Sequence, residues 1–290
     1  LLDSQADVVV LDARRFDEYQ TMSIPTGISV PGAELVLRAR ELAPDPATCI
    51  IVNCAGRTRS IIGTQSLINA GVANPVCALR NGTIGWTLAG QKLAHGQSRR
   101  FAPTSEAHRQ AAAEDARRVA DKARVGRATF ADLQRWQQEA TRTTYLFDVR
   151  TPEEFDAGHL PGARSTPGGQ LVQETDHVAS VRGARLVLAD DDGVRANMSA
   201  SWLAQLGWEV YVLDGLQPTH FSDKGAWVAP VPAPPQAELI SPQTLAEWLA
   251  HGDTVVLDFT ASANYVKRHI PGAWWALRAQ LPDALAKAPA

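Results

Sequence analysis

The fold is decided by the stretch IIVNCAGRTRS, residues 50–60. Its first residues, Ile-Ile-Val-Asn, form a short β-branched run of the kind that makes a buried strand. Residues 60–70 then have the composition of a helix, and Gly71 suits the left-handed position that follows a helix. We predict a strand, a tight loop and a helix in direct succession, with Cys54 where the strand becomes the loop.

The loop after this strand has the features of an anion site. Backbone N–H groups converge where a helix begins, because the first turn of a helix offers them no partners. These amides, together with Arg57 and Arg59, would stabilise a thiolate at Cys54 and make it nucleophilic. Cys49 and Cys77 lie within apolar, strand-like runs, so for them we expect buried, unreactive side chains.

The same pattern occurs three times along the chain. An apolar run ends in aspartate at Asp12, Asp148 and Asp258, at offsets of 136 and 246 residues from the first copy. The same offsets align further residues: Ile24-Pro25 with Leu160-Pro161 and Ile270-Pro271, and Pro31-Gly32 with Pro167-Gly168. Agreement of this density predicts tandem copies of one structural unit.

Each copy alternates strands with helices. The second copy repeats the strand at residues 186–189 and the helix at residues 196–206, which ends at Gly207. This alternation predicts an α/β fold of tandem modules, each a parallel sheet flanked by helices on both faces. Functional residues are then expected at the carboxyl ends of the strands, where the central loops lie.

The repeats divide the chain into segments. We predict a first module over residues 1–103, a charged, solvated connecting helix over 104–126 and a second module over 127–229. Residues 230–236 form a proline-rich joint, which we expect to be extended and stiff.

A third, partial module is predicted over residues 237–290. The equivalent of Cys54 would fall at position 300, beyond Ala290, and the first module has little sequence ahead of its first strand. We therefore expect a piece of a longer protein, with a third module of low stability that can self-associate through unpaired sheet surface.

The second module has an acid where the first has its cysteine. Position 190, equivalent to Cys54, is aspartate, and Arg195 corresponds to Arg59. The acids at positions 190–192 repel anions, and a carboxylate is a poor nucleophile toward sulfur, so we predict that this module is inert. Between a metal site and helix capping, we favour capping for these acids.

Other polar residues are interpreted as structural. Arg14 with Glu18, and Arg150 with Glu154, recur four residues apart, and we expect an ion pair within each set. The histidines that precede two of the proline turns are expected to be turn or core residues, because the first copy has Ser23 at that place; they are His159 and His269.

Composition narrows the class of protein. A chain of 290 residues exceeds one typical domain, and a net charge of −3 provides no overall basic field to favour nucleic acid or an anionic membrane surface. No apolar run approaches the length of a membrane span. Three cysteines without a C-x-x-C pair offer neither a disulfide framework nor zinc spacing, which fits a reducing, cytoplasmic compartment.

Together these motifs resemble the rhodanese (thiosulfate sulfurtransferase) family: a strand-end aspartate, a Leu-Pro-Gly turn and a cysteine loop that closes on arginine. The resemblance covers nearly the whole chain. It implies that Cys54 forms a persulfide, that Arg59 is the loop arginine and that Trp86 is the tryptophan after the last strand. It also implies which residues surround a bound donor: Ala55, Gly56, Arg57, Thr58 and Ser60.

The resemblance implies a double displacement without a metal or an organic cofactor. Cys54 would take the outer sulfur of a small anionic, thiosulfate-like donor and pass it to a thiol or cyanide-like acceptor. Two alternatives stay open. A cysteine phosphatase or arsenate reductase would place five residues between cysteine and arginine, whereas four separate Cys54 from Arg59. A non-catalytic interaction protein is favoured by the two modules that lack a visible nucleophile.

Overall fold

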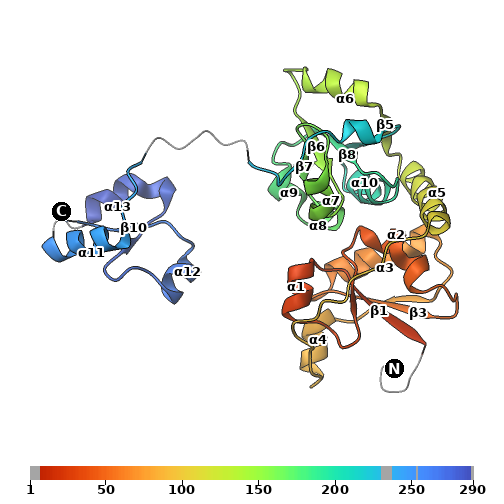
Figure 1. Cartoon of the computed structure of the whole chain (residues 1–290), viewed down its shortest axis with the longest axis horizontal. Coiled ribbons are helices and arrows are strands. Elements are labelled where there is room, and N and C mark those ends of the chain that lie inside the picture. Colours follow the sequence, from red (N-terminus) through yellow and green to blue (C-terminus); the bar gives the residue numbers. More distant parts are fainter. Residues whose placement is uncertain (1–6, 230–236, 253, 289–290) are drawn as a thin grey trace. The chain divides into compact units, whose positions relative to one another are not determined.

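The computed structural model describes residues 7–229, 237–252 and 254–288 (Figure 1). The chain divides into two units, Leu1–Val228 and Ala229–Ala290, and each is described by itself. The proline-rich joint predicted at residues 230–236 lies outside the described residues.

The first module is built on a four-stranded parallel sheet. Its strands run in the order β2-β1-β3-β4, where the bounds are β1 (Val8–Asp12), β2 (Ile28–Ser29), β3 (Cys49–Asn53) and β4 (Val76–Ala78). Asp12 on β1 lies opposite Asn53 on β3, so the two central strands end at the same level. Cys54 therefore emerges at the carboxyl edge of the sheet, as the sequence predicts.

The helices of this module are α1 (Phe16–Thr21), α2 (Glu34–Leu42), α3 (Thr58–Ala70) and α4 (Gly82–Leu88). The helix predicted after the cysteine loop is α3, and Gly71 ends it with a φ of 78°. α3 approaches α2 closely at Gly63, where a Cβ would lie 2.5 Å from Leu35. This approach fixes the helix that begins at the loop against the core of the module.

The second module repeats this plan with an additional edge strand. Its parallel strands run in the order β5-β9-β8-β6-β7, with bounds β5 (Gly126–Ala128), β6 (Thr144–Asp148), β7 (Arg164–Ser165), β8 (Arg185–Ala189) and β9 (Glu209–Leu213). Its helices are α6 (Phe130–Gln137), α7 (Pro152–Ala157), α8 (Gly168–Gln173), α9 (Thr175–Val178), α10 (Arg195–Gln205) and the 3-10 turn η1 (Pro218–His220). Asp148 ends opposite Ala189, as Asp12 ends opposite Asn53, and the predicted α/β repeat is confirmed.

Helix α5 (Glu106–Lys122) connects the two modules, and it corrects the expectation of a solvated connecting helix. Its charged side is exposed, but Ala112, Ala116 and Ala120 are completely buried. Because these alanines are four residues apart, they share one face of the helix. That face packs against α2 and α3 of the first module and against α10 of the second (Figure 1). α5 thus contributes buried side chains to the cores of both modules.

A buried ionic cluster also holds the two modules together. Arg195, at the start of α10, is 1% exposed and is surrounded by carboxylates. It donates to Glu34 of the first module at 2.9 Å and to Glu154 of its own module at 2.5 Å. Asp191 and Asp192 complete the cluster, at 3.0 and 2.5 Å. Breaking a buried ion pair such as that of Arg195 with Glu34, whose side chains are 2% and 3% exposed, costs about 3–5 kcal/mol, so each module stabilises the other at this point.

Two carboxylates of this cluster titrate in opposite directions. Burial raises the pKa of Glu34 above its ordinary value, and the positive charges beside it only partly offset this. Burial also opposes ionisation of Glu154, but the hydrogen bonds and charge of Arg195 outweigh it and hold the pKa of Glu154 at about 2.

The second unit contains three helices, one 3-10 turn and a parallel pair of short strands: α11 (Pro242–His251), α12 (Ser262–Lys267), α13 (Leu281–Lys287), η2 (Arg278–Gln280), β10 (Leu257–Asp258) and β11 (Trp274–Trp275). In the apolar run that ends at Asp258, the strand therefore comprises only Leu257–Asp258. Of the described residues in this unit only Ala273 and Ala276 are buried, so the unit has little core of its own.

The two histidines of the proline turns are structural, as predicted. His159 stacks on Phe155 with ring centroids 3.7 Å apart, and His269 stacks on Tyr265 at 4.0 Å. In both cases Nδ1 also lies within hydrogen-bonding distance of the backbone carbonyl of the aromatic partner. The same local packing thus recurs in the second module and in the second unit.

Glu154 is predicted to make the stability of the first unit depend on pH. Because its pKa is depressed in the folded state from an ordinary value of 4.5, its contribution is fully present above that value and is lost as the pH falls through about 2. Between about pH 5 and pH 3, Glu154→Gln should therefore lose less unfolding free energy than the parent protein, as measured by urea unfolding. Glu114→Gln, on the exposed side of α5, is the control. Equal pH dependence in all three proteins would contradict the prediction.

Candidate active site

The cysteine loop lies where strand β3 gives way to helix α3. Cys54 is only 2% exposed, and its thiol is 3.4 Å from the hydroxyl of Ser60. Ser60 in turn donates to the carbonyl of Arg57 at 3.0 Å, which closes the loop on itself. The structure thus brings the residues predicted for the site into a single loop: Cys54, Ala55, Gly56, Arg57, Thr58, Arg59 and Ser60.

Helix α4 braces this loop from outside, a contact that the sequence analysis missed. The Thr83 amide donates to the Cys54 carbonyl at 3.0 Å, and the Ile84 amide donates to the Ala55 carbonyl at 3.1 Å. Gly82, with a φ of 53°, lies so close that a Cβ on it would sit 2.0 Å from the Cys54 oxygen. The Asn-Gly turn at the start of α4 was the available signal, because only a residue without Cβ fits there.

Arg59 is bound to a carboxylate of the first helix. Its Nη1 and Nη2 donate to the two oxygens of Glu18 on α1, at 2.5 and 2.8 Å. The hydrogen bonds to Glu18 raise the pKa of Arg59, and those from Arg59 lower the pKa of Glu18. Arg59 also lies within electrostatic range of Cys54. The pair therefore ties the loop to α1, and it has little net charge left with which to attract an anion.

The expected pairing of Arg14 with Glu18 is wrong. Arg14 folds back on the strand-end aspartate instead, and its Nε and Nη2 donate to Asp12 at 2.9 and 2.7 Å with both side chains buried. Because Arg14 precedes α1, a spacing of four residues does not place it on the helix face beside Glu18.

The second module repeats both pairs, so the expected pairing of Arg150 with Glu154 is wrong as well. Arg150 donates to Asp148 at 2.7 Å, and Arg195 donates to Glu154 at 2.5 Å. The arginine and glutamate of this loop-to-helix pair are separated by 41 residues in both modules. The pair is therefore a feature of the fold.

Arg57 carries the free positive charge of the cysteine loop. Its side chain is exposed and, within the described part of the chain, has no ion-pair or hydrogen-bond partner. Thr58 is also exposed, whereas Ala55 and Gly56 are partly buried. Long-range attraction of an anion therefore falls to Arg57, whereas the sequence analysis counted the charges of Arg57 and Arg59 together.

In the second module the acids cap the loop and the helix, as predicted. Asp190 accepts hydrogen bonds from the Ala196 amide at 2.8 Å and from the Gly193 amide at 3.2 Å. Asp192 accepts from the Val194 amide at 2.6 Å. Burial, reinforced by the negative charge of Asp192, raises the pKa of Asp190 well above its ordinary value. The loop amides of this module thus hold a buried carboxyl group.

The remaining candidate residues lie apart from the loop. Contrary to expectation, Cys77 is exposed, because β4 is an edge strand, and Cys49, at the start of β3, is only partly buried. Trp86 lies on α4 and donates its Nε1 to the Lys92 carbonyl at 2.9 Å. Among the residues that the structure describes, no group of three or more His, Cys, Asp or Glu side chains could hold a metal ion. In the same described residues no helix has the length and apolar character to cross a membrane.

Arg57 and Arg59 are predicted to affect Cys54 differently. Arg57→Gln removes a free charge and should slow alkylation of Cys54 by anionic iodoacetate about twofold to fivefold at low salt, with little effect on neutral iodoacetamide. Arg59→Gln breaks the pair with Glu18 and should change both rates together. Peptide mass spectrometry at Cys54 measures the rates. Equal effects of Arg57→Gln on the two reagents would contradict the assignment of the free charge.

The contact between α4 and the loop is tested by two glycine substitutions. Gly82→Ala should lower the free energy of unfolding by about 3 kcal/mol or more, because it adds a clash with Cys54 to an unfavourable φ. At Gly90, which has a φ of 75°, a Cβ would meet no described atom within 4 Å. Gly90→Ala therefore measures only the cost of placing a residue with a Cβ at a positive φ. That cost is about 1 kcal/mol. Equal losses of unfolding free energy for Gly82→Ala and Gly90→Ala in denaturant would contradict this prediction. They would show that the loop shifts to accommodate the added methyl group.

Known proteins match this chain in regions that correspond to the two modules. A family model described as Rhodanese-like domain matches residues 1–89 and 129–215, which is more than half of the chain. A solved thiosulfate sulfurtransferase from Pseudomonas aeruginosa is 72% identical with a TM-score of 0.92, and the match covers 99% of this chain and 55% of that chain. The uncharacterized protein YqhL from Bacillus subtilis (strain 168) is 36% identical over 75 residues, which are 26% of this chain and 58% of YqhL.

This chain thus spans little more than half the length of each of these two relatives. The two matched regions are the two modules whose sheets, central loops and arginine–glutamate pairs are described above. The chain belongs to the rhodanese-like family.

Proposed function

We propose that this chain is a sulfurtransferase that carries a transferable sulfur as a persulfide on Cys54. The loop geometry shared by the two modules carries the proposal. In the second module the Gly193 and Ala196 amides donate to the two side-chain oxygens of Asp190. At the repeat offset they correspond to the amides of Arg57 and Ser60, so an equivalent nest would hold the outer sulfur of a Cys54 persulfide.

The proposed reaction is a double displacement. The Cys54 thiolate attacks the outer sulfur of a thiosulfate-like donor, the sulfur–sulfur bond of the donor breaks, and its electron pair leaves with sulfite. A thiolate or cyanide acceptor then attacks the outer sulfur of the persulfide, and Cys54 departs again as a thiolate. Arg57 attracts the anionic donor, and the pair of Arg59 with Glu18 keeps the loop in shape.

The P. aeruginosa relative supports thiosulfate as the donor, since it is described as a thiosulfate sulfurtransferase. A phosphatase or arsenate reductase fits the loop less well. Those reactions need the loop arginine to clamp a tetrahedral oxyanion, whereas both terminal nitrogens of Arg59 are occupied by Glu18. In the second module Asp190 fills the place of the nucleophile, so we propose a structural role for that module.

The proposal is tested by sulfur loading. After treatment of the purified chain with thiosulfate, peptide mapping should find one additional sulfur atom on the Cys54 peptide, removable by cyanide or dithiothreitol. Cys54→Ser should abolish loading, while Cys49→Ser and Cys77→Ser serve as matched controls and should retain it. Wild-type loading in Cys54→Ser would reject the function, and absence of loading in the parent protein would reject thiosulfate as donor.

Mercaptopyruvate, tried in parallel, separates these outcomes. Loading by mercaptopyruvate alone would keep the Cys54 mechanism and change the donor. Absence of loading by either compound would favour the non-catalytic interaction protein.

A further inference from the structure

Exposed apolar side chains lie on the two helices whose first turns contact the cysteine loop. Ile61 on α3 is 54% exposed, and Ile84 and Leu88 on α4 are 56% and 81% exposed. Two of them are bonded directly to the loop: the Ile61 amide donates to the Arg57 carbonyl at 3.0 Å, and the Ile84 amide donates to the Ala55 carbonyl at 3.1 Å. Leu88 follows Ile84 by one helical turn and shares its face.

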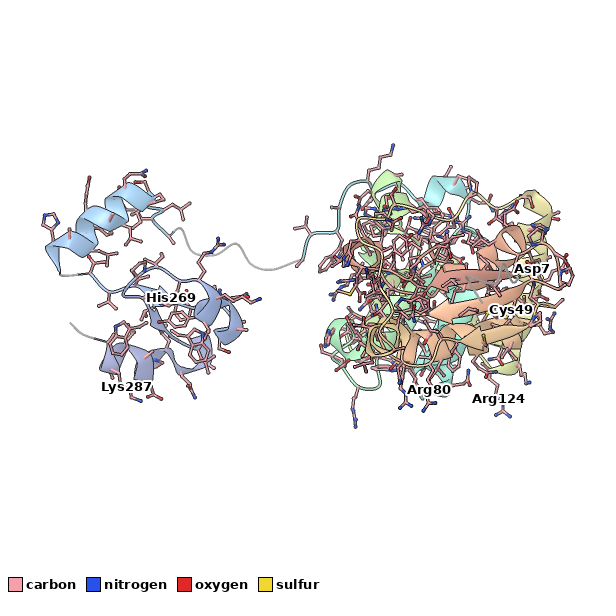
Figure 2. All side chains as sticks on the ribbon, turned by 90° about the horizontal axis from the view of Figure 1, so that it is seen from below. Asp7, Cys49, Arg80, Arg124, His269 and Lys287 are labelled. Atoms are coloured by element: carbon pink, nitrogen blue, oxygen red, sulfur yellow. The ribbon has the colours of Figure 1, made fainter. Side chains whose placement is uncertain are left out.

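Two arginines next to these helices also carry unpaired positive charge: Arg57 in the loop and Arg80 just before α4. Arg57 and Arg80 are exposed and have no partner within the described part of the chain, and Figure 2 shows Arg80 at the surface of the first unit. The sequence around them is basic. Residues 46–105 contain six Lys and Arg and no Asp or Glu, although the whole chain has a net charge of −3. We call the group of Ile61, Ile84, Leu88, Arg57 and Arg80 the collar.

Two of the collar residues, Ile84 and Leu88, lie on helix α4 of the first unit. Helix α4 is at the end of the first module that faces away from the second (Figure 1). A cluster of exposed apolar side chains rimmed by charge is typical of a protein–protein contact surface, and its positive sign selects an acidic partner. A small anion would satisfy the arginines but would leave the three apolar side chains uncovered.

We infer that the collar docks an acidic polypeptide that presents the acceptor thiol to Cys54. This inference rests on the proposed sulfur transfer and specifies its acceptor. Since Cys54 is 2% exposed, the acceptor thiol must protrude into the loop. The residues on either side of that thiol in the partner then cover the collar. The transfer itself is balanced: the acceptor thiolate bonds to the outer sulfur, the persulfide bond breaks, and Cys54 regains its thiolate.

The test measures the second-order rate constant of sulfur transfer from thiosulfate-loaded protein to defined thiols. The probes are synthetic peptides with one cysteine flanked by Asp and Leu, by Lys and Leu, or by Asp and Ser, together with neutral 2-mercaptoethanol. We expect the Asp/Leu peptide to react about tenfold faster than the Lys/Leu peptide at low salt, with a gap that shrinks as salt is added. The Asp/Ser peptide should be slower than the Asp/Leu peptide, because it lacks the apolar flank.

Single substitutions on the collar have matched controls outside it. Arg80→Gln and Leu88→Ser should each slow transfer to the Asp/Leu peptide about threefold or more, and should leave transfer to 2-mercaptoethanol unchanged. Arg124→Gln, at an exposed arginine labelled in Figure 2 that follows α5, and Ile68→Ser, two helical turns beyond Ile61 on α3, should change neither rate.

The outcomes separate the docking surface from the chemistry. If loaded protein transfers sulfur to 2-mercaptoethanol but treats all peptides and all four variants alike, the docking inference is overturned and the sulfurtransferase function stands. If the chain cannot be loaded with sulfur at all, the proposed function fails and the acceptor assignment fails with it.

Discussion

The arginine–glutamate pair that ties each central loop to the first helix of its module is the contact on which both modules depend. In the first module it joins Arg59 to Glu18 at the edge of the cysteine loop. In the second module Arg195 keeps the equivalent bond to Glu154 and adds one to Glu34 of the first module. One repeated contact therefore holds the cysteine loop in one copy and joins the modules in the other.

These two uses exclude each other for electrostatic reasons. Once Arg195 is buried at the interface, carboxylates must surround it to offset the loss of hydration, and Asp191 and Asp192 of the same loop supply part of that charge. Those acids oppose the approach of any further anion. The second loop can thus serve as an interface or as an anion receptor, and the buried Asp190 already occupies the amides that a persulfide would need.

The sequence predicted what local patterns and repeats encode: the strand endings, the cysteine loop, Gly71 and the capping acids. The sequence did not predict contacts between residues that lie far apart in the chain. The spacing of Arg14 and Glu18 suggested a pair, but the partner of Glu18 is Arg59, 41 residues away, and only comparison of both repeats at that separation could have revealed it. Helix α5 was misjudged because its buried face is made of alanines, whose small apolar surface is hidden in a charged composition.

The net charge of the chain was misleading for a related reason. It adds together charges that are paired within the protein and charges that are not. Many of the arginines, such as Arg59 and Arg195, are neutralised by carboxylates that touch them, so they contribute little field outside the protein. Arg57 and Arg80 have no such partner within the described residues and lie in a stretch without a single acid. The unpaired charge of the cysteine loop is therefore positive although the chain as a whole is negative. A binding partner responds to the unpaired charges around Cys54, because those are the charges that remain to be neutralised on binding.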